Sequence, residues 1–255
     1  VICGQCVVNC PTGALRERDD TERVLKAIDD PQKITLIQIA PSVRTSWGEE
    51  LGLPREEATV ERLAACLRKI GFDYIFDTDF AADLTIMEEA TELIHMLTDG
   101  KDHKFPLFTS CCPGWVRFVK ARYPEFLPQL SSAKSPQQMF GAIAKSYYAE
   151  ALAVDSKDIY SVSAMPCIAK KEEAAYPSMN SANGQDQDVD TVLTVRELCR
   201  MIKAAHIDVT QIAEEPLDTP LGFGSGAGTI FGTTGGVMEA ALRSAYHFIT
   251  GENPI

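Results

Sequence analysis

Two adjacent cysteines, Cys111 and Cys112, are the first residues in this sequence that point to chemistry. They lie in the stretch 109–115, Thr-Ser-Cys-Cys-Pro-Gly-Trp, directly after a short apolar segment. In an extended backbone, neighbouring side chains point to opposite faces. We therefore expect the two thiols to have different roles, one as a metal ligand and the other facing a different part of the site.

Three further cysteines stand near the start of the chain. Cys3, Cys6 and Cys10, followed by Pro11, have the spacing of the last three cysteines in the bacterial iron–sulfur pattern C-x2-C-x2-C-x3-C-P. In two-cluster ferredoxins the cysteine before proline ligates the other cluster, so Cys10 would serve a second one. A zinc site on Cys3 and Cys6 is the alternative, but the Cys-Pro-Thr-Gly-Ala tail favours iron–sulfur.

Another thiol, Cys167, follows Met165 and Pro166 and is expected in the first turn of a helix. Backbone N–H groups and the helix dipole favour a thiolate there. Lys170 lies three residues on, and Glu173 is spaced to hold its ammonium. The alternative is a buried structural cysteine beside an ordinary surface Lys–Glu pair, and the segment alone favours this alternative.

An acidic run marks the helix expected at 83–97. At 100° per residue, Glu89 falls at the edge of the apolar stripe and Glu92 lies further towards solvent. The stripe itself consists of Ile86, Ala90, Leu93 and Leu97. A partly buried carboxyl has a raised pKa, so this series could relay protons. The alternative is a solvated acidic face, which is the more usual outcome for such runs.

These residues must be positioned by a fold that the apolar pattern indicates. Strands are expected at 33–40, 74–76, 105–109 and 159–165, and helices at 56–70, 83–97, 135–152, 166–175, 195–205 and 237–249. Strands that alternate with helices indicate an α/β fold with largely parallel sheets, in which ligands collect beyond the carboxyl ends of the strands. The glycines at 221–236 match no nucleotide-binding motif and indicate close approach to a ligand or a neighbouring helix. Cys66 and Cys199 stand alone on helices and are expected to be structural.

Composition bounds the function. The 255 residues suffice for one large or two modest domains. A formal charge of −12 argues against nucleic acid and an anionic membrane surface as partners. No run approaches the ~18 apolar residues of a membrane helix. Eight cysteines without a signal peptide indicate a reducing compartment and metal chemistry, although a chain that starts at Val1 is expected to begin partway through a protein.

Three stretches carry a resemblance to a known family: 109–115, 130–139 (Leu-Ser-Ser-Ala-Lys-Ser-Pro-Gln-Gln-Met) and 165–173 (Met-Pro-Cys-Ile-Ala-Lys-Lys-Glu-Glu). The first and third look like the first two signature motifs of the [FeFe]-hydrogenases, and the spacing between them is similar too. The resemblance extends from Cys3 to the final helix. It implies an α/β fold of two lobes with mainly parallel sheets flanked by helices, and an active site in the cleft between the lobes.

The resemblance also implies an H-cluster, a [4Fe–4S] cube joined through one cysteine to a di-iron unit with CO, cyanide and a bridging dithiolate. By the matching motifs, Cys112 and Cys167 would ligate the cube, and Cys111 would give its thiol to protons beside the di-iron unit. The proton path would continue through Glu89, Ser131 and Glu92. Around the di-iron unit, the resemblance implies cyanide contacts from Lys170, Ser42 and the backbone beside Pro41, and packing by Met165, Gln137 and Phe231.

The resemblance is incomplete at both ends. The family's third signature motif, with two further cysteine ligands, does not occur in these residues, and the first iron–sulfur pattern lacks a cysteine. A cube needs four thiolates and this chain supplies two, so we expect an internal fragment that cannot hold the H-cluster alone. The expected domains are a ferredoxin-like remnant at 1–25 and a catalytic domain at 26–255, with lobes at about 26–130 and 131–255.

The implied function is reversible reduction of protons to H2. Electrons would come from ferredoxin or a similar carrier through accessory [4Fe–4S] clusters, and maturation proteins would build the di-iron unit. The implied location is the cytoplasm of an anaerobic or facultatively anaerobic cell. Two alternatives are a non-catalytic relative of the iron–sulfur assembly type and a hydrogen-sensing member with an appended domain. The joint presence of Cys111, Met165 and Lys170 favours the enzyme over the assembly type.

Overall fold

A computed structural model describes residues 3–219 and 222–254. Expected segments that begin or end at Val1, Leu221 or Ile255 therefore reach outside the described residues. Among the described residues, no helix combines the length and apolar character that a membrane crossing requires.

The chain forms two compact units whose segments alternate along the sequence. One unit, called here the sheet unit, comprises Ile2–Thr78 and Phe140–Pro220. The other, called the helical unit, comprises Asp79–Met139 and Leu221–Ile255. This division differs from the two consecutive lobes expected from the sequence, because strands from both halves of the chain join one sheet.

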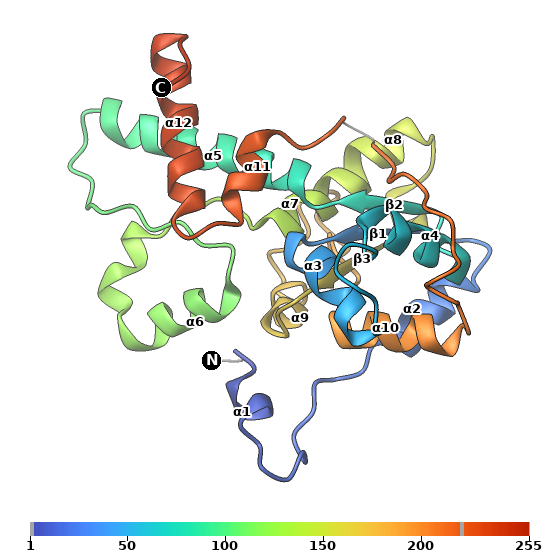
Figure 1. Cartoon of the computed structure of the whole chain (residues 1–255). Coiled ribbons are helices and arrows are strands. Elements are labelled where there is room, and N and C mark those ends of the chain that lie inside the picture. The colour runs from blue at the N-terminus through green and yellow to red at the C-terminus, as the bar shows by residue number, and fades with distance from the viewer. Residues whose placement is uncertain (1–2, 220–221, 255) are drawn as a thin grey trace. The chain divides into compact units, whose positions relative to one another are not determined.

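The sheet unit is built on four parallel strands in the order β2-β1-β3-β4 (Figure 1). Their bounds are β1 Ile34–Ile39, β2 Tyr74–Asp77, β3 Ile159–Met165 and β4 Thr191–Thr194. The central pair, β1 and β3, is in register from Ile34–Ile159 to Ile39–Ala164. The expected α/β class with a parallel sheet is thus confirmed, and β3 has the bounds expected from its apolar run.

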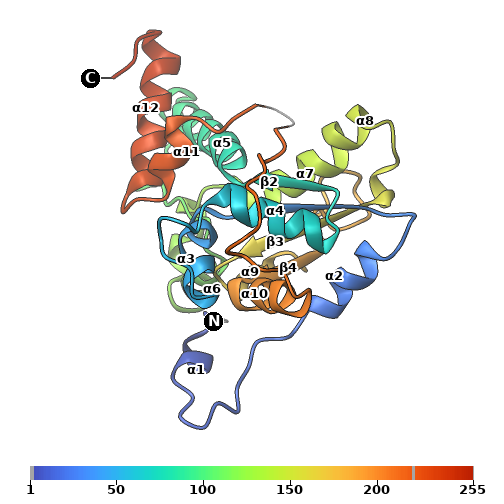
Figure 2. The ribbon, with the colours of Figure 1, turned by 45° about the vertical axis from the view of Figure 1, so that its right-hand side comes forward.

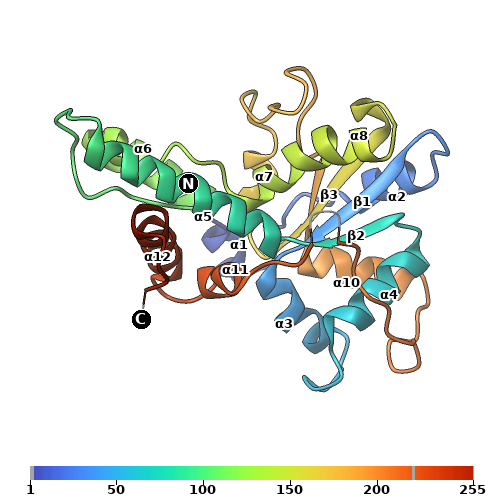
Figure 3. The same ribbon diagram turned by 90° about the horizontal axis from the view of Figure 1, so that it is seen from above.

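One face of the sheet carries the main apolar core. Ile37 and Ile39 of β1 and Val162 and Ala164 of β3 are fully buried on this face. Three helices cover it: α3 (Pro41–Glu50), α4 (Val60–Ile70) and α10 (Val195–Ala204), as Figure 3 shows. Capping fixes two of their ends, since Thr59 accepts the Arg62 N–H at the start of α4 and Gly71, with φ +121°, follows its end.

The opposite face of the sheet is covered by the second half of α7 (Pro136–Ile143), the π-helix η2 (Ala144–Tyr148) and α8 (Ala149–Ala151). Aromatic rings join them to the sheet, since Phe76 of β2 packs against both Phe140 and Tyr148. The single helix expected at 135–152 is therefore interrupted by a π segment. Smaller elements of this unit are α1 (Gln5–Val8), α2 (Thr21–Ile28), η3 (Ser156–Asp158) and α9 (Ala169–Glu173).

The helical unit contains α5 (Asp79–Thr98), α6 (Pro113–Arg122), η1 (Pro124–Gln129), α11 (Gly226–Phe231) and α12 (Gly236–Thr250). The helices α5, α11 and α12 pack against one another (Figures 1 and 2). A Cβ atom on Gly224 would lie 2.7 Å from Cβ of Asp79, and one on Gly228 would lie 2.8 Å from the Asp79 carbonyl oxygen. The glycines thus allow close approach to a neighbouring helix, one of the two roles expected for them.

Three local expectations are wrong. The strand expected at 105–109 reduces to an isolated bridge between Phe108 and Leu130, because Pro106 has no N–H for a ladder. The helix expected to open at Pro166 begins only at Ala169. The helix expected from residue 56 begins at Val60, where Thr59 caps it. The apolar pattern also did not predict the elements α2, α3, α6 and β4.

Candidate functional site

The carboxyl edge of the sheet brings together two of the expected site segments. Ile39 pairs with Ala164, and the Ala40 N–H donates to the Ala164 carbonyl at 3.1 Å. Pro41, which starts α3 at its first position, therefore lies beside Met165, the last residue of β3. Parallel sheets gather ligands at this edge. The structure thus places Pro41 and Ser42 in the same region as Met165 and Cys167.

Cys167 lies between β3 and α9 rather than inside the helix. It is partly exposed, and its carbonyl accepts the Lys170 N–H at 3.1 Å. Since α9 begins at Ala169, the expected place of this thiol in the first helical turn is wrong. The helix dipole therefore gives no argument for a thiolate here, because α9 has only five residues.

Lys170 and Glu173 form a buried ion pair on α9. The Lys170 ammonium donates to Oε2 of Glu173 at 2.8 Å. Both residues are only 7% exposed. The spacing argument for the pair is confirmed, and the alternative of an ordinary surface pair is wrong. Burial of two charges requires close pairing of this kind, since an isolated buried charge is very costly.

Cys111 and Cys112 lie at the start of α6 in the helical unit. Cys112 is the N-cap, with the extended angles φ −96° and ψ 108°, and it is exposed, whereas Cys111 is partly buried. The Cys112 N–H donates to Oγ of Ser110 at 3.1 Å. Pro113 at the first helical position needs no N–H partner, which explains why the helix starts here. The different roles expected for the two thiols stay a prediction.

The acidic side chains of α5 range from buried to exposed. Glu89 is only 3% exposed, Glu92 is partly exposed and Glu88 is exposed. Burial, together with the negative charge of Glu92, raises the pKa of Glu89 to about 7. This confirms the expected gradient and contradicts the solvated face for Glu89. The expected stripe extends too far, however, because Leu97 is 62% exposed.

Ser131 is joined directly to the acidic series. Its Oγ–H donates to Oε2 of Glu92 at 2.6 Å, and the Ser132 N–H donates to Oε1 of the same carboxylate at 3.1 Å. The Ser131 hydroxyl also accepts the Ala133 N–H at 3.1 Å. The hydroxyl thus has one fixed donor direction, towards Glu92. A hydroxyl held between a carboxylate and a backbone donor is suited to proton exchange with that carboxylate.

Two more expected residues belong to the helical unit. Gln137 is the second residue of α7 and is 1% exposed. Phe231 ends α11 and is partly buried. Their expected packing around a di-iron unit stays a prediction.

The N-terminal cysteines lie around the short helix α1. Cys3 and Cys6 are exposed and Cys10 is partly exposed. A hydrogen bond with the Thr12 hydroxyl, helped by backbone N–H groups, lowers the pKa of the Cys10 thiol to about 7. Cys66 and Cys199 behave differently: both are fully buried, and burial raises their pKa values to about 11 and 12. The expected structural character of these two thiols is confirmed.

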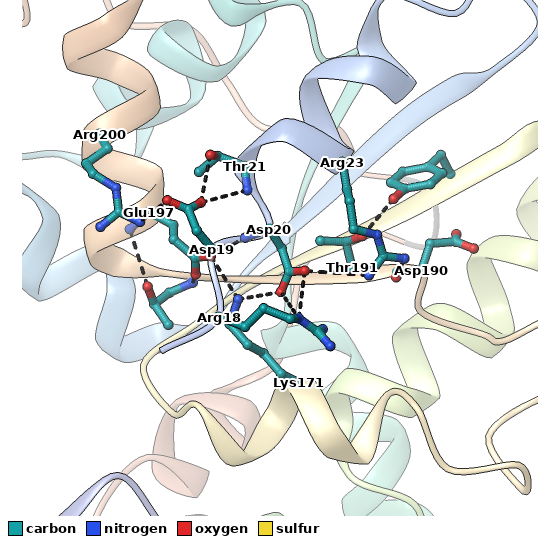
Figure 4. A network of polar contacts seen from close by, with 12 residues as sticks. Arg18, Asp19, Asp20, Thr21, Arg23, Lys171, Asp190, Thr191, Glu197 and Arg200 are labelled. Carbon is teal, nitrogen blue, oxygen red and sulfur yellow. Dashed lines mark hydrogen bonds and ion pairs between the residues drawn. The ribbon is translucent and has the colours of Figure 1, made fainter. Parts of the chain in front are cut away.

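Sequence reasoning missed a buried network around Lys171 (Figure 4). The Lys171 ammonium donates to Oδ2 of Asp20 at 2.7 Å and to Oε1 of Glu197 at 2.8 Å. Lys171 lies in the charged run 170–173, and charged runs usually form a solvated surface. A local signal existed for Glu197, which completes a capping box with Thr194 at the start of α10.

The thiol chemistry of this chain fits an iron–sulfur cluster, but its donor set is too small to hold the expected cube. A cube needs four thiolates. The chain offers Cys112 in the helical unit and Cys167 in the sheet unit. Among residues 3–219 and 222–254, no three Cys, His, Asp or Glu side chains gather as a metal site would require.

The chain is similar to known hydrogenases. It is 51% identical over 254 residues to "NADP-reducing hydrogenase subunit HndD" of Solidesulfovibrio fructosivorans, covering 98% of this chain and 43% of the relative. It is 46% identical to "Periplasmic [Fe] hydrogenase large subunit" of Nitratidesulfovibrio vulgaris, covering 91% of this chain and 54% of the relative. The chain thus spans about half the length of these relatives.

A solved hydrogenase structure is also similar to this chain, and a more distant relative is named as an assembly component. A solved structure of an apo variant of [FeFe]-hydrogenase HydA1 from Chlamydomonas reinhardtii matches with a TM-score of 0.81 and 44% identity, over 93% of this chain and 60% of that one. "Cytosolic iron-sulfur assembly component 3" of Bos taurus is 30% identical over 98% of this chain and 55% of its own length. Residues 33–255 match the family described as "Iron only hydrogenase large subunit, C-terminal domain". This chain therefore belongs to the family formed by the C-terminal domains of iron-only hydrogenase large subunits.

Proposed function

We propose that the whole protein is an [FeFe]-hydrogenase that interconverts protons, electrons and H2. Family membership and relatives named as hydrogenases at 46–51% identity support this proposal. The observation that carries it is Glu89, a buried carboxyl whose pKa of about 7 suits proton exchange at neutral pH. A purely structural role does not explain why this helix buries a carboxyl so close to Glu92.

The proposed cofactor is an H-cluster, which supplies the redox chemistry when bound. We assign Cys112 and Cys167 as two of the four thiolate ligands of its cube. Lys170 and the Pro41–Ser42 segment would bind the anionic cyanide groups, since charge-assisted hydrogen bonds are the strong ones. The side chains assigned to packing around the di-iron unit are Met165, Gln137 and Phe231.

The chain's own residues also provide the proposed proton path. Cys111 would exchange protons beside the di-iron unit, and Glu89, Ser131 and Glu92 would carry them onward. The 2.6 Å hydrogen bond between Ser131 and Glu92 supports the outer part of this path. Burial raises the pKa of Glu89 to about 7, which suits proton exchange on this path.

The N-terminal residues are proposed to belong to an electron-transfer module. Residues 1–25 would be the end of a ferredoxin-like domain, in which Cys3, Cys6 and Cys10 ligate accessory [4Fe–4S] clusters. Residues 26–255 would belong to the catalytic domain. Ferredoxin or a similar carrier would exchange electrons with the module, and maturation proteins would install the di-iron unit.

We propose a cytoplasmic location in an anaerobic or facultatively anaerobic cell, on the basis of composition. Eight cysteines, three of them at 3, 6 and 10 with the spacing of iron–sulfur ligands, fit a reducing compartment. One relative is named as periplasmic, so the family is not confined to one compartment. Cell fractionation decides this point, and recovery in the periplasm would contradict it.

The test of the function uses the whole protein loaded with iron–sulfur clusters and a di-iron unit. We expect H2 evolution from reduced methyl viologen, and loss of turnover with retained cluster iron in Cys111→Ser. Cys66→Ser is the matched control, because that thiol is buried away from solvent. No H2 evolution by the loaded wild-type protein would favour the alternative, a non-catalytic relative like the assembly component. Loss of the cube's spectrum in Cys111→Ser would show that Cys111, and not Cys112, ligates the cube.

A further inference from the structure

The chain between the N-terminal cysteines and β1 is bound closely to the sheet unit. Glu17 accepts a hydrogen bond from Arg196 at 3.0 Å, and Asp19 accepts one from Arg200 at 2.9 Å. Both of these contacts involve a largely exposed arginine. Ion pairs at exposed positions contribute little to stability. The third contact of this segment, made by Asp20, is of a different kind.

Asp20, Lys171 and Glu197 form a buried triad (Figure 4). Asp20 is 1% exposed, Glu197 is fully buried, and the Lys171 side chain is 8% exposed. The Lys171 ammonium bridges the two carboxylates at 2.7 and 2.8 Å, and the Asp20 N–H donates to Oε1 of Glu197 at 2.8 Å. The other oxygen of Glu197 accepts the Thr194 N–H at 2.7 Å. These bonds can all form in only one relative position of the three chain segments.

The other end of the same N-terminal stretch lies close to this region too. Gly4 lies between Cys3 and Cys6, and a Cβ atom on it would lie 3.5 Å from Cδ1 of Ile168. Ile168 directly follows Cys167 in the sequence. Gly4 thus lies near Ile168, while Asp20 contacts Lys171, so both ends of the stretch 4–20 lie close to one short segment, 168–171. That segment directly follows Cys167 and contains both Lys170 and Lys171.

We propose that the Asp20–Lys171–Glu197 triad positions the N-terminal cysteine segment against the segment that carries Cys167 and Lys170. Its purpose rests on the proposed function, in which electrons pass between a cluster on the N-terminal cysteines and a cluster on Cys167. Supporting contacts hold such ligands at a fixed separation. A buried ion triad gives a defined register, because a shifted chain would take Asp20 away from the buried Lys171 and Glu197 side chains. Asp20 itself would keep Arg18, whose Nε–H donates to its Oδ1 at 2.9 Å.

The first test measures amide hydrogen exchange of residues 11–20 in the whole protein without its clusters. Lys171→Met keeps the side-chain length but removes the bridging charge. We expect exchange of the Asp20 amide, which donates to Glu197, to become at least tenfold faster, while exchange in β3 stays within twofold of wild type. Arg200→Met, which removes an exposed contact with the neighbouring Asp19, is the matched control and is expected to leave exchange unchanged.

Two further variants separate positioning from folding. If Lys171→Met does not fold, Asp20→Asn combined with Lys171→Met removes one charge of each sign and is used for the same measurement. Lys171→Arg keeps a donor for both carboxylates, so its exchange is expected to be as slow as that of wild type. In the cluster-loaded protein, the magnetic interaction between the N-terminal cluster and the cluster on Cys167 is expected to weaken in Lys171→Met.

The outcomes distinguish this proposal from the proposed function. Unchanged exchange of the Asp20 amide in whichever of these two variants folds would overturn the role of the triad, whatever the H2 assay shows. Faster exchange with no H2 evolution by wild type would leave the triad as the contact that holds the segment and would reject the hydrogenase. A loss of protection spread equally over β3 would show a general structural role and would also overturn the positioning proposal.

Discussion

Helices α5 and α9 each bury an ionisable group of the candidate site, but they treat it in opposite ways. On α9, Lys170 is 2.8 Å from the Glu173 carboxylate, and both are buried. On α5, Oε2 of Glu89 is buried and has no hydrogen-bond partner among the described residues. The paired group is held in one place by its partner, whereas burial and Glu92 raise the pKa of Glu89 to about 7.

The same fold thus contains one buried charge that is fixed by a partner and one buried carboxyl that can exchange a proton. A buried ion pair keeps its geometry, because moving either partner would leave the other charge unpaired in an apolar environment. A buried carboxyl without a cation changes its protonation instead. Lys170 is thus suited to fixing a ligand in place, and Glu89 to passing a proton. Substitutions at Glu89, Lys170 and Ser131 test this contrast between a fixed and a titrating group.

Glu89→Gln removes the group that can exchange a proton but keeps its shape. In the cluster-loaded whole protein we expect turnover to fall by roughly 10²–10⁴-fold, the usual contribution of a positioned acid or base. H2 evolution with reduced methyl viologen measures this. Glu88→Gln, on the exposed face of the same helix, is the control and should retain its turnover. Wild-type turnover in Glu89→Gln would reject the proton path.

Lys170→Met leaves the buried Glu173 carboxylate without the cation observed beside it. Breaking a buried pair from one side typically costs about 3–5 kcal/mol of folding free energy. Urea denaturation of the protein without clusters measures this loss at pH 7. Lys26→Met breaks an exposed pair with Glu22 and is expected to cause no measurable change. Equal stability of Lys170→Met and wild type would mean that α9 does not depend on the pair.

The pH dependence of stability tests the other side of the contrast. The folded-state pKa of Glu89 is about 7, above the ordinary value of 4.5, so the folded protein binds this proton more tightly than the unfolded chain. The contribution of Glu89 is therefore most favourable below about pH 4.5 and is lost as the pH rises through 7. Glu89→Gln should become more stable than wild type at pH 8, by up to about 3 kcal/mol.

The measurement is the difference in unfolding free energy between Glu89→Gln and wild type at pH 5 and at pH 8, without clusters. A difference that stays constant between the two pH values would show that Glu89 does not titrate in this range. Glu88→Gln serves again as the control, since its side chain is exposed.

Ser131→Ala removes one hydrogen bond of the outer proton path and has the smallest expected effect. The hydroxyl donates to Glu92 at 2.6 Å, but the Ser132 N–H still binds that carboxylate after the change. We expect a loss of about 1.5–3 kcal/mol in stability, the usual value for a bond to a charged group. Ser146→Ala, which removes a 2.6 Å bond within a helix, is the control for loss of a hydroxyl. A more than hundredfold loss of turnover would make Ser131 as important as Glu89.

Much of the fold could be predicted from apolar patterns. β3 has the expected bounds, and α10 begins at the expected Val195, because these segments bury a continuous run or a clear helical face. The expected strand at 105–109 failed because its apolar residues surround Pro106 and have no neighbouring strand. Helix ends were missed where one side chain decides them, as Thr59 does for α4.

The candidate site shows the same division. The spacing of Lys170 and Glu173 within one helix allowed their pairing to be predicted. The edge position of Glu89 on the α5 stripe predicted its raised pKa. Lys171 escaped prediction because its partners are Asp20, 151 residues away, and Glu197, 26 residues away. Local spacing carries no information about contacts over such separations.

The amino-acid sequence specifies which groups are available: the thiols at 111, 112 and 167, the acids of α5 and the lysines of α9. The motifs also determined the family to which the chain belongs. Which of these charges are buried and paired depends on the three-dimensional fold, and this explains why Lys170 and Lys171 are held in place while Glu89 can titrate. The physical reason is that a side chain's solvation depends on residues distant in sequence, and solvation sets the free energy of its charge.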